Sequence, residues 1–182
     1  MPKGLNIDKA FNAAVGNTDT FYIWAEGVTQ AQNTRSLTLF NGSTSDFIYS
    51  IRDLTPINLS LAAVTGVACR YDLIRISAIG TGGTAITPVP AASTMAVVDG
   101  NFDARKNATG GATEGSTFWA IVIGTDEVAS NTTGQVAGSY VPLGRACDLT
   151  LVPGDGLLIK QITDTVVGDI GWLVTITRNK AS

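Results

Sequence analysis

Residues 151–178 read LVPGDGLLIKQITDTVVGDIGWLVTITR. Two runs rich in β-branched and aliphatic residues, 156–162 and 170–177, flank a polar connection that contains glycine. This pattern predicts two strands, the first of which begins after a Pro-Gly-Asp-Gly turn. We therefore expect a β-hairpin near the end of the chain.

The second of these runs alternates, because successive side chains of a strand point to opposite faces. One face carries Trp172, Val174 and Ile176. An apolar set with a period of two predicts that the tryptophan lies in a core. The opposite face is neutral, and we predict that its Leu173 and Thr175 contact a neighbouring subunit.

Length and composition set the domain plan. A chain of 182 residues can bury about 70% of its unfolded surface in one domain, without a disulfide or a metal. We expect one domain over residues 19–182.

Charged residues make up 15% of the chain, where about 25% is usual. The surface is therefore expected to be largely neutral. Two interpretations stay open: an ordinary β-rich surface, or one covered by copies of the chain or by a partner.

An N-terminal arm is expected over residues 1–18. Ile7, Phe11 and Val15 recur at four-residue spacing, which gives one weak apolar face of a helix. Two alternatives stay open for this segment: a loosely ordered terminus, or an arm that docks on a neighbouring subunit.

Alternation and turn residues predict further strands between the arm and the C-terminal stretch. A strand buried on both sides is expected over 20–25, and a second hairpin, with an Asn-Gly turn, over 35–53. The segment 67–78 alternates and then changes phase near Leu73, which predicts a bulge or a switch between sheets. Prolines confine the next segment to an edge or a loop, and a short strand is expected at 95–98.

Two adjoining segments differ in composition. Segment 99–116 is polar and rich in glycine, which predicts a long exposed loop. Segment 117–123 predicts a strand with apolar side chains on both faces, typical of a central strand under a second layer or of one pressed against another subunit. Since the outer faces of a two-layer sandwich are open, we favour a subunit contact through Trp119, Ile121 and Ile123.

The whole pattern is eight or nine short strands punctuated by glycine, proline, asparagine and serine, with no sustained helical periodicity. It predicts an all-β fold, an antiparallel β-sandwich. A jelly roll is favoured over an immunoglobulin-like topology, because the chain lacks a Cys-Trp-Cys spacing.

The residues that usually carry catalysis are scarce. The chain has no histidine, which excludes histidine-activated nucleophiles and every metal site that uses histidine. Its two cysteines, Cys69 and Cys147, are expected to be small buried hydrophobes in a reducing compartment. A lone acidic pair, Asp126 and Glu127, is more typical of a solvated loop than of a glycosidase. We expect no catalytic or cofactor-binding residue, and therefore no enzyme.

The best candidate for a metal site is Asp99-x-Asn101-x-Asp103, whose oxygen ligands alternate as at the start of a calcium loop. The glycine and the closing glutamate of that loop are replaced by Ala104 and Gly110. Calcium requires six to eight oxygen ligands. An ordinary polar loop is therefore the expected structure, with no metal.

Charge and hydropathy limit the partners. A formal charge of −3 without a basic stripe gives no source for the counterion release that drives binding to nucleic acid. No apolar run is long enough to span a bilayer, and the N-terminus lacks a secretory h-region. We expect a protein made in a cytoplasm, with neither nucleic acid nor membrane as partner.

Three stretches together resemble virion structural proteins of tailed bacteriophages that carry a jelly-roll domain. They are LTLFNGSTSDFIYSIRDL, AAVTGVACRYDLIRISAIGTGGTAITPVP and VPGDGLLIKQITDTVVGDIGWLVTITR. Among these proteins the chain looks most like a capsid decoration, or cement, protein. The resemblance covers most of residues 35–90 and 149–178, and it supplies no catalytic residue.

The resemblance implies a homotrimer that sits on the outer capsid at junctions between capsomers, made in the host cytoplasm and carried in the virion. Its partners would be copies of itself and the major capsid protein, with Ile7, Phe11 and Val15 in a capsid-docking arm. The alternative is a receptor- or glycan-binding module of a phage tail or fibre, in which exposed aromatic residues and segment 99–116 face a host polysaccharide.

Overall fold

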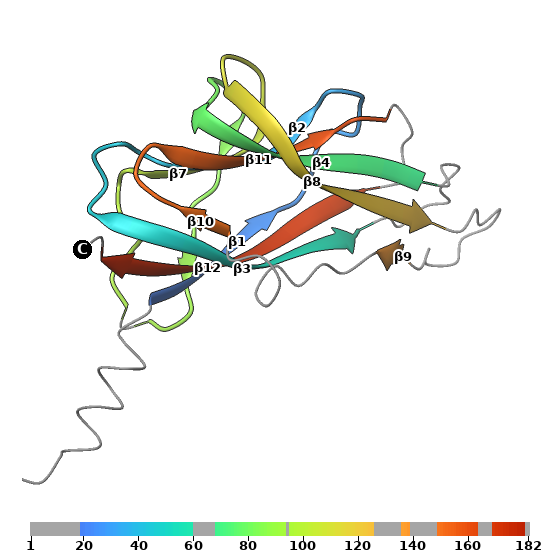
Figure 1. Ribbon diagram of the computed structural model, residues 1–182. Coiled ribbons are helices and arrows are strands. Elements are labelled where there is room, and N and C mark those ends of the chain that lie inside the picture. The colour runs from blue at the N-terminus through green and yellow to red at the C-terminus, as the bar shows by residue number, and fades with distance from the viewer. Residues whose placement is uncertain are drawn as a thin grey trace, which may run out of the picture.

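The computed structural model describes residues 19–59, 68–93, 95–125, 136–138, 149–163 and 169–180. The regular elements in these ranges are β-strands, which form two antiparallel sheets packed against each other (Figure 1). The fold is therefore an all-β sandwich, as expected. The same ranges contain no helix that could cross a membrane. Outside them lie the expected arm with Ile7, Phe11 and Val15, and the side chains of Asp126, Glu127 and Cys147.

The first sheet has the strand order β10-β3-β12-β1-β6. Its strands are β10 (Leu149–Leu151), β3 (Phe47–Asn58), β12 (Ile170–Lys180), β1 (Asp19–Ala25) and β6 (Val89–Pro90). β12 lies between β1 and β3 and pairs with both along nearly its whole length. The C-terminal strand is therefore the centre of this sheet.

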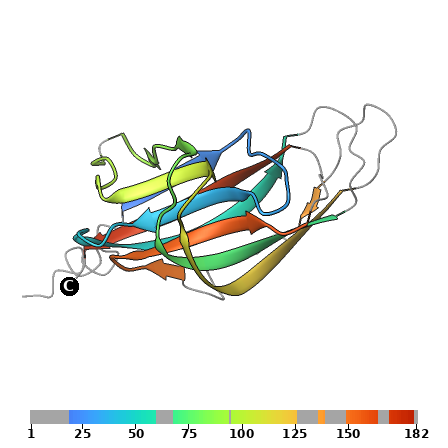
Figure 2. The same cartoon turned by 90° about the horizontal axis from the view of Figure 1, so that it is seen from above.

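The second sheet has the order β5-β7-β2-β11-β4-β8-β9. Its strands are β5 (Thr84–Ala85), β7 (Phe102–Ala108), β2 (Arg35–Asn41), β11 (Asp155–Gln161), β4 (Ala68–Ala78), β8 (Thr113–Thr125) and β9 (Val136–Gly138). β8 is strongly curved (Figure 2). The proline-punctuated segment supplies only the short strands β5 and β6, which lie at sheet edges as expected.

The core lies between the sheets. Its largest fully buried side chain is Trp172 of β12, which meets Tyr71 of β4 edge to face across the two layers, with ring centroids 5.1 Å apart. Val174 and Ile176 are also fully buried. The predicted core face of the last strand is therefore confirmed.

Both predicted hairpins are wrong in their pairing, although the strands exist. β2 and β3 belong to different sheets, and so do β11 and β12. Each short connection carries the chain from one layer to the other, so the partners of each strand are distant in sequence. Alternation reports which face of a strand is apolar, and a turn reports that the chain reverses. Neither signal reports in which layer the returning strand pairs.

Three other predictions of strand or loop are wrong. Segment 99–116 contains β7, whose Phe102 and Ala104 are buried while its polar residues alternate outward. The high polarity of that segment therefore belongs to one face of a strand. Residues 95–98 form no strand. β1 is buried on one face only, because Tyr22 and Trp24 are exposed.

The change of phase in β4 has a structural cause. The pairing of β4 with β8 shifts register three times between Leu73 and Ala78, whereas its pairing with β11 stays regular. The expected irregularity is confirmed, and β4 stays in one sheet. Ile74 and Ile76 face outward into a second apolar cluster with Leu158. The apolar pattern changes face because both faces of β4 are covered there.

Candidate functional site

A row of exposed apolar and neutral side chains runs across the outer face of the first sheet. Tyr22 of β1 pairs with Val89 of β6 on one side and with Thr175 of β12 on the other. Trp24 pairs with Leu173 in the next row. Paired residues of antiparallel strands share a face. We call this set of five residues the neutral face.

The neutral face exposes large apolar side chains that a solvated sheet rarely carries together. Val89 is 60% exposed, Tyr22 43% and Trp24 37%, while Leu173 and Thr175 are half-buried beside them. A buried aromatic side chain covers about 150–250 Å², and each Å² of apolar area is worth about 25 cal/mol. Because about 40% of each of these two side chains is exposed, covering them would remove roughly 120–200 Å² from water and contribute about 3–5 kcal/mol to an association.

Charges stand at the rim of the neutral face. Trp24 donates from Nε1 to Oε2 of Glu26 at 3.1 Å. Asp53 of β3 pairs with Thr175 and accepts a hydrogen bond from Thr55. The five residues of the face itself carry no charge, so a copy of the chain meets no like-charge repulsion at its centre.

The structure separates the predicted interface residues into three groups. Leu173 and Thr175 lie in the neutral face. Ile121 and Ile123 are buried in the core between the sheets, so their assignment to a subunit contact is wrong. Their apolar face serves the fold of one chain. Trp119 remains 40% exposed on β8, and its role in an interface stays a prediction.

Sequence reasoning missed Tyr22, Trp24 and Val89. The signal was present, because TFYIWA alternates two apolar sets and only one of them can face the core of a two-layer sandwich. Val89 lies between two prolines on an edge strand. Only the register of β6 with β1 reveals that it extends the face formed by Tyr22.

The carboxylates of the candidate calcium loop are held apart. Asp99 accepts hydrogen bonds from Oγ of Ser45 at 2.8 Å and from the backbone of Asn101. Burial by itself raises the pKa of Asp99, but these hydrogen bonds outweigh it and lower the pKa below its usual value. Asp103 binds Arg105 instead, at 2.7 Å. Within the described ranges, no three acidic, cysteine or histidine side chains are grouped to hold a metal.

Most of the acidic side chains on the sheets are occupied by cations. The ion pairs are Arg35–Glu114, Lys160–Glu114, Arg70–Asp72, Arg75–Asp155, Arg105–Asp103 and Arg178–Asp19. A general acid needs a carboxyl group that is protonated near neutral pH, usually through burial away from cations. The paired carboxylates are therefore suited to holding strands in place.

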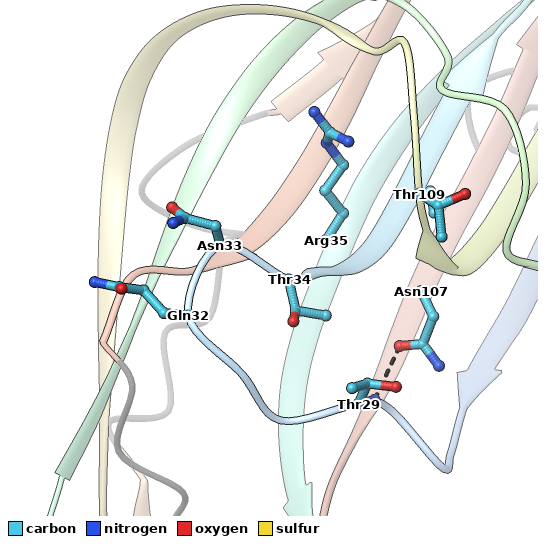
Figure 3. Close-up of a pocket in the computed structure, with 8 residues that line it drawn as sticks. Thr29, Gln32, Asn33, Thr34, Arg35, Asn107 and Thr109 are labelled. Atoms are coloured by element: carbon cyan, nitrogen blue, oxygen red, sulfur yellow. Dashed lines mark hydrogen bonds between the residues drawn. The ribbon is translucent and has the colours of Figure 1, made fainter.

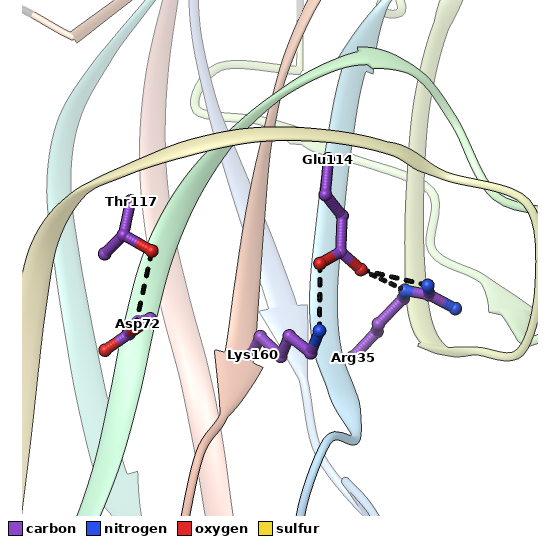
Figure 4. Close-up of polar contacts among 5 residues, drawn as sticks. All are labelled: Arg35, Asp72, Glu114, Thr117 and Lys160. Carbon is purple, nitrogen blue, oxygen red and sulfur yellow. Dashed lines mark hydrogen bonds and ion pairs between the residues drawn. The ribbon is translucent and has the colours of Figure 1, made fainter.

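Glu114 joins three strands. It lies in the first half of β8, which arches over the outer face of the second sheet (Figure 4). Its Oε1 accepts two hydrogen bonds from Arg35 of β2, at 2.9 and 3.0 Å, and its Oε2 accepts one from Nζ of Lys160 at 2.9 Å. Ile74, Ile76 and Leu158 form the apolar cluster on this outer face. Glu114 therefore connects the arched part of β8 to β2 and β11 beside that cluster.

Replacing Glu114 with glutamine is expected to lower the free energy of unfolding at pH 7 by about 1.5–3 kcal/mol, because hydrogen bonds from two cations lose their charged acceptor. Burial by itself raises the pKa of Glu114, but the hydrogen bonds from Lys160 and Arg35 outweigh it and lower the pKa below the usual 4.5. The contribution is therefore complete above that value and is lost as the pH falls through the lowered pKa.

Urea denaturation of both proteins, repeated from pH 7 into acid, measures this difference. The gap between wild type and Glu114→Gln should close as Glu114 becomes protonated. Equal stability of the two proteins at pH 7, or a gap that persists in strong acid, would contradict the assignment.

Comparison of the chain with protein-family models, with curated protein sequences and with solved structures finds no match.

Proposed function

We propose that this protein is a non-enzymatic structural component of a phage virion, which binds the outer capsid as a homotrimer and bridges capsomers. The observation that carries the proposal is the neutral face, which exposes Tyr22, Trp24 and Val89 beside Leu173. An exposed apolar patch with a charged rim is typical of a contact between proteins. Its lack of charge favours a second copy of the chain as the occupant.

We further propose that the sandwich is a jelly roll. In one sheet the order β10-β3-β12-β1, and in the other β2-β11-β4-β8, interleave strands from the two ends of the chain. This interleaving is what two nested Greek keys produce. β5, β6 and β7 are then an insertion between the fourth strand of the roll, β4, and the fifth, β8. The order supports the finer topology expected from the resemblance to phage virion proteins.

Binding to several capsomers at once would strengthen the attachment of the trimer to the capsid. A protein that binds the assembled capsid but not free capsid subunits stabilises the assembly by mass action. A trimer that touches several capsomers gains affinity of about 10²- to 10⁴-fold over a single contact. Modest neutral contacts therefore suffice, and the low charge of the chain reduces the desolvation cost of each.

Imaging of virions that carry a labelled copy of this chain tests the proposal. We expect many copies distributed over the head at junctions between capsomers. A small number of copies confined to the tail would overturn the capsid role in favour of a tail module. Virions of the same phage with a label on the major capsid protein provide the reference for head density.

A further inference from the structure

The pocket where the connection between β1 and β2 meets the end of β7 has a cavity volume of about 290 Å³ (Figure 3). The side-chain amides of Gln32 and Asn33 point away from Arg35, whose charge is compensated by Glu114. The polar groups of its lining therefore do not converge on one ligand position, and the pocket is not a ligand site.

A homotrimer with three-fold symmetry needs two different contact surfaces on each copy. Around a three-fold axis a surface of one copy meets a different surface of the next copy, whereas a surface that meets itself gives a two-fold dimer. The neutral face supplies one of these surfaces. The second surface must lie elsewhere on the molecule.

β8 exposes two neighbouring aromatic side chains, Phe118 and Trp119, which are 37% and 40% exposed. Trp119 pairs with Leu73 of β4. The next pair joins Thr117 to Ile74, so β8 carries one extra residue between them. In such a bulge two successive residues oppose a single residue of the partner strand. Both aromatic side chains therefore lie on the side of Leu73, and we call them the aromatic pair.

The contacts of Arg75 place the aromatic pair further. Its guanidinium carbon lies 5.6 Å from the centre of the Phe118 ring, and Arg75 pairs with the fully buried Leu157 of β11. Phe118 therefore lies on the core-facing side of the second sheet, at a place that the first sheet leaves exposed. Arg75 donates to the carbonyl of Thr150 at 2.8 Å and binds Asp155 at 3.0 Å. Its charge is compensated, so the aromatic pair is part of an uncharged surface.

The aromatic pair and the neutral face match in size and in chemistry. The exposed parts of Phe118 and Trp119 amount to roughly 115–190 Å², close to the value for Tyr22 and Trp24 of the neutral face. β8 lies beside the short final strand of the second sheet, whereas the neutral face lies on the outer face of the first sheet. Surfaces on adjacent sides of a molecule are related by a rotation, which can close a ring of copies.

We propose that the aromatic pair of one copy packs on the neutral face of the next copy around the three-fold axis. This inference rests on the proposed trimer and names the second half of its interface. Trp119 contacts Tyr22 and Trp24 of the neighbouring copy, where aromatic rings gain from offset or edge-to-face packing. Each copy contributes both surfaces, so three equivalent contacts close the ring and cover all the exposed aromatic side chains of both kinds.

The variant Trp119→Glu tests the proposal by sedimentation equilibrium of the full chain. Glutamate at this position would be buried against an uncharged surface, so we expect the dissociation constant to rise by about 100-fold or more and the chain to sediment as a monomer. Circular dichroism and the urea midpoint should match those of the wild type, because Trp119 is 40% exposed.

Val122→Glu is the matched control. Val122 is 50% exposed on the same strand, but its neighbours Ile121 and Ile123 point into the core, so Val122 points to the opposite face. This variant should keep the mass of the trimer. If Trp119→Glu also kept that mass, the inference would be overturned while the trimer stood. A wild-type chain that sediments as a monomer would overturn both.

Mixing two monomeric variants tests the pairing of unlike surfaces directly. Leu173→Glu keeps an intact aromatic pair, and Trp119→Glu keeps an intact neutral face. Their mixture should form a dimer of twice the 18.9 kDa of one chain, whereas each variant alone stays a monomer. One contact lacks the avidity of a closed ring, about 10²- to 10⁴-fold, so the mixture is measured at about 100-fold higher concentration than the wild type. A mixture that stays monomeric there would overturn the proposed contact.

Discussion

Replacing Trp172 with alanine is expected to lower the free energy of unfolding by about 3–5 kcal/mol. Trp172 is the largest fully buried side chain and bridges the two layers through its edge-to-face contact with Tyr71. Its removal leaves a cavity at the centre of the sandwich, which rigid sheets close only in part. Because the free energy of unfolding of a domain is only about 5–15 kcal/mol, this change removes a large part of it. Urea denaturation followed by far-ultraviolet circular dichroism measures it.

Two control variants test whether the loss of stability comes from the buried volume of Trp172. Trp172→Phe keeps most of the buried area, and Nε1 of Trp172 has no hydrogen-bond partner among the described residues. That variant should therefore lose less than half as much stability. Trp24→Ala removes a tryptophan that is 37% exposed and should cost far less in the isolated chain. A loss below about 1 kcal/mol for Trp172→Ala would contradict the core described above.

Replacing Leu173 with glutamate is expected to convert the proposed trimer into a monomer. Leu173 pairs with Trp24 within the neutral face, so a neighbouring subunit would bury the new carboxylate without a cation. Burying an unpaired ion costs several kcal/mol. A cost of about 3 kcal/mol at each contact raises the dissociation constant more than 100-fold. Size-exclusion chromatography with light scattering measures the resulting mass.

Val152→Glu is the matched control for this charge. Val152 is 45% exposed and directly follows β10, which lies at the opposite edge of the first sheet from β6. This variant adds the same charge to an exposed apolar position outside the neutral face and should keep the mass of the wild type. If both variants kept that mass, a different surface would have to mediate association. If both lost it, the effect would not be specific to the neutral face.

Much of the fold could be predicted from the sequence, because alternation is a property of single strands. It placed Trp172, Val174 and Ile176 in the core, and it located the irregularity in β4 at Leu73. Pairing is a property of strands that are distant in sequence. Alternation therefore could not show that β11 and β12 separate into different sheets.

The candidate site was less predictable than the core. The alternation of β12 predicts Leu173 and Thr175 as an outward-facing neutral pair. Ile121 and Ile123 are predicted to lie in a subunit interface, but they are buried in the core between the sheets. An apolar face of a strand looks the same in the sequence whether a second sheet or a second subunit covers it. Tyr22, Val89 and Leu173 come from three separate segments, and only sheet register brings them together.

In the proposed assembly the neutral face joins copies of this chain. Sedimentation equilibrium of the wild-type chain at micromolar concentration measures the mass of that assembly. We expect a mass of three times the 18.9 kDa of one chain, and a mass of one chain for Leu173→Glu. A wild-type protein that sediments as a monomer with the neutral face intact would contradict it.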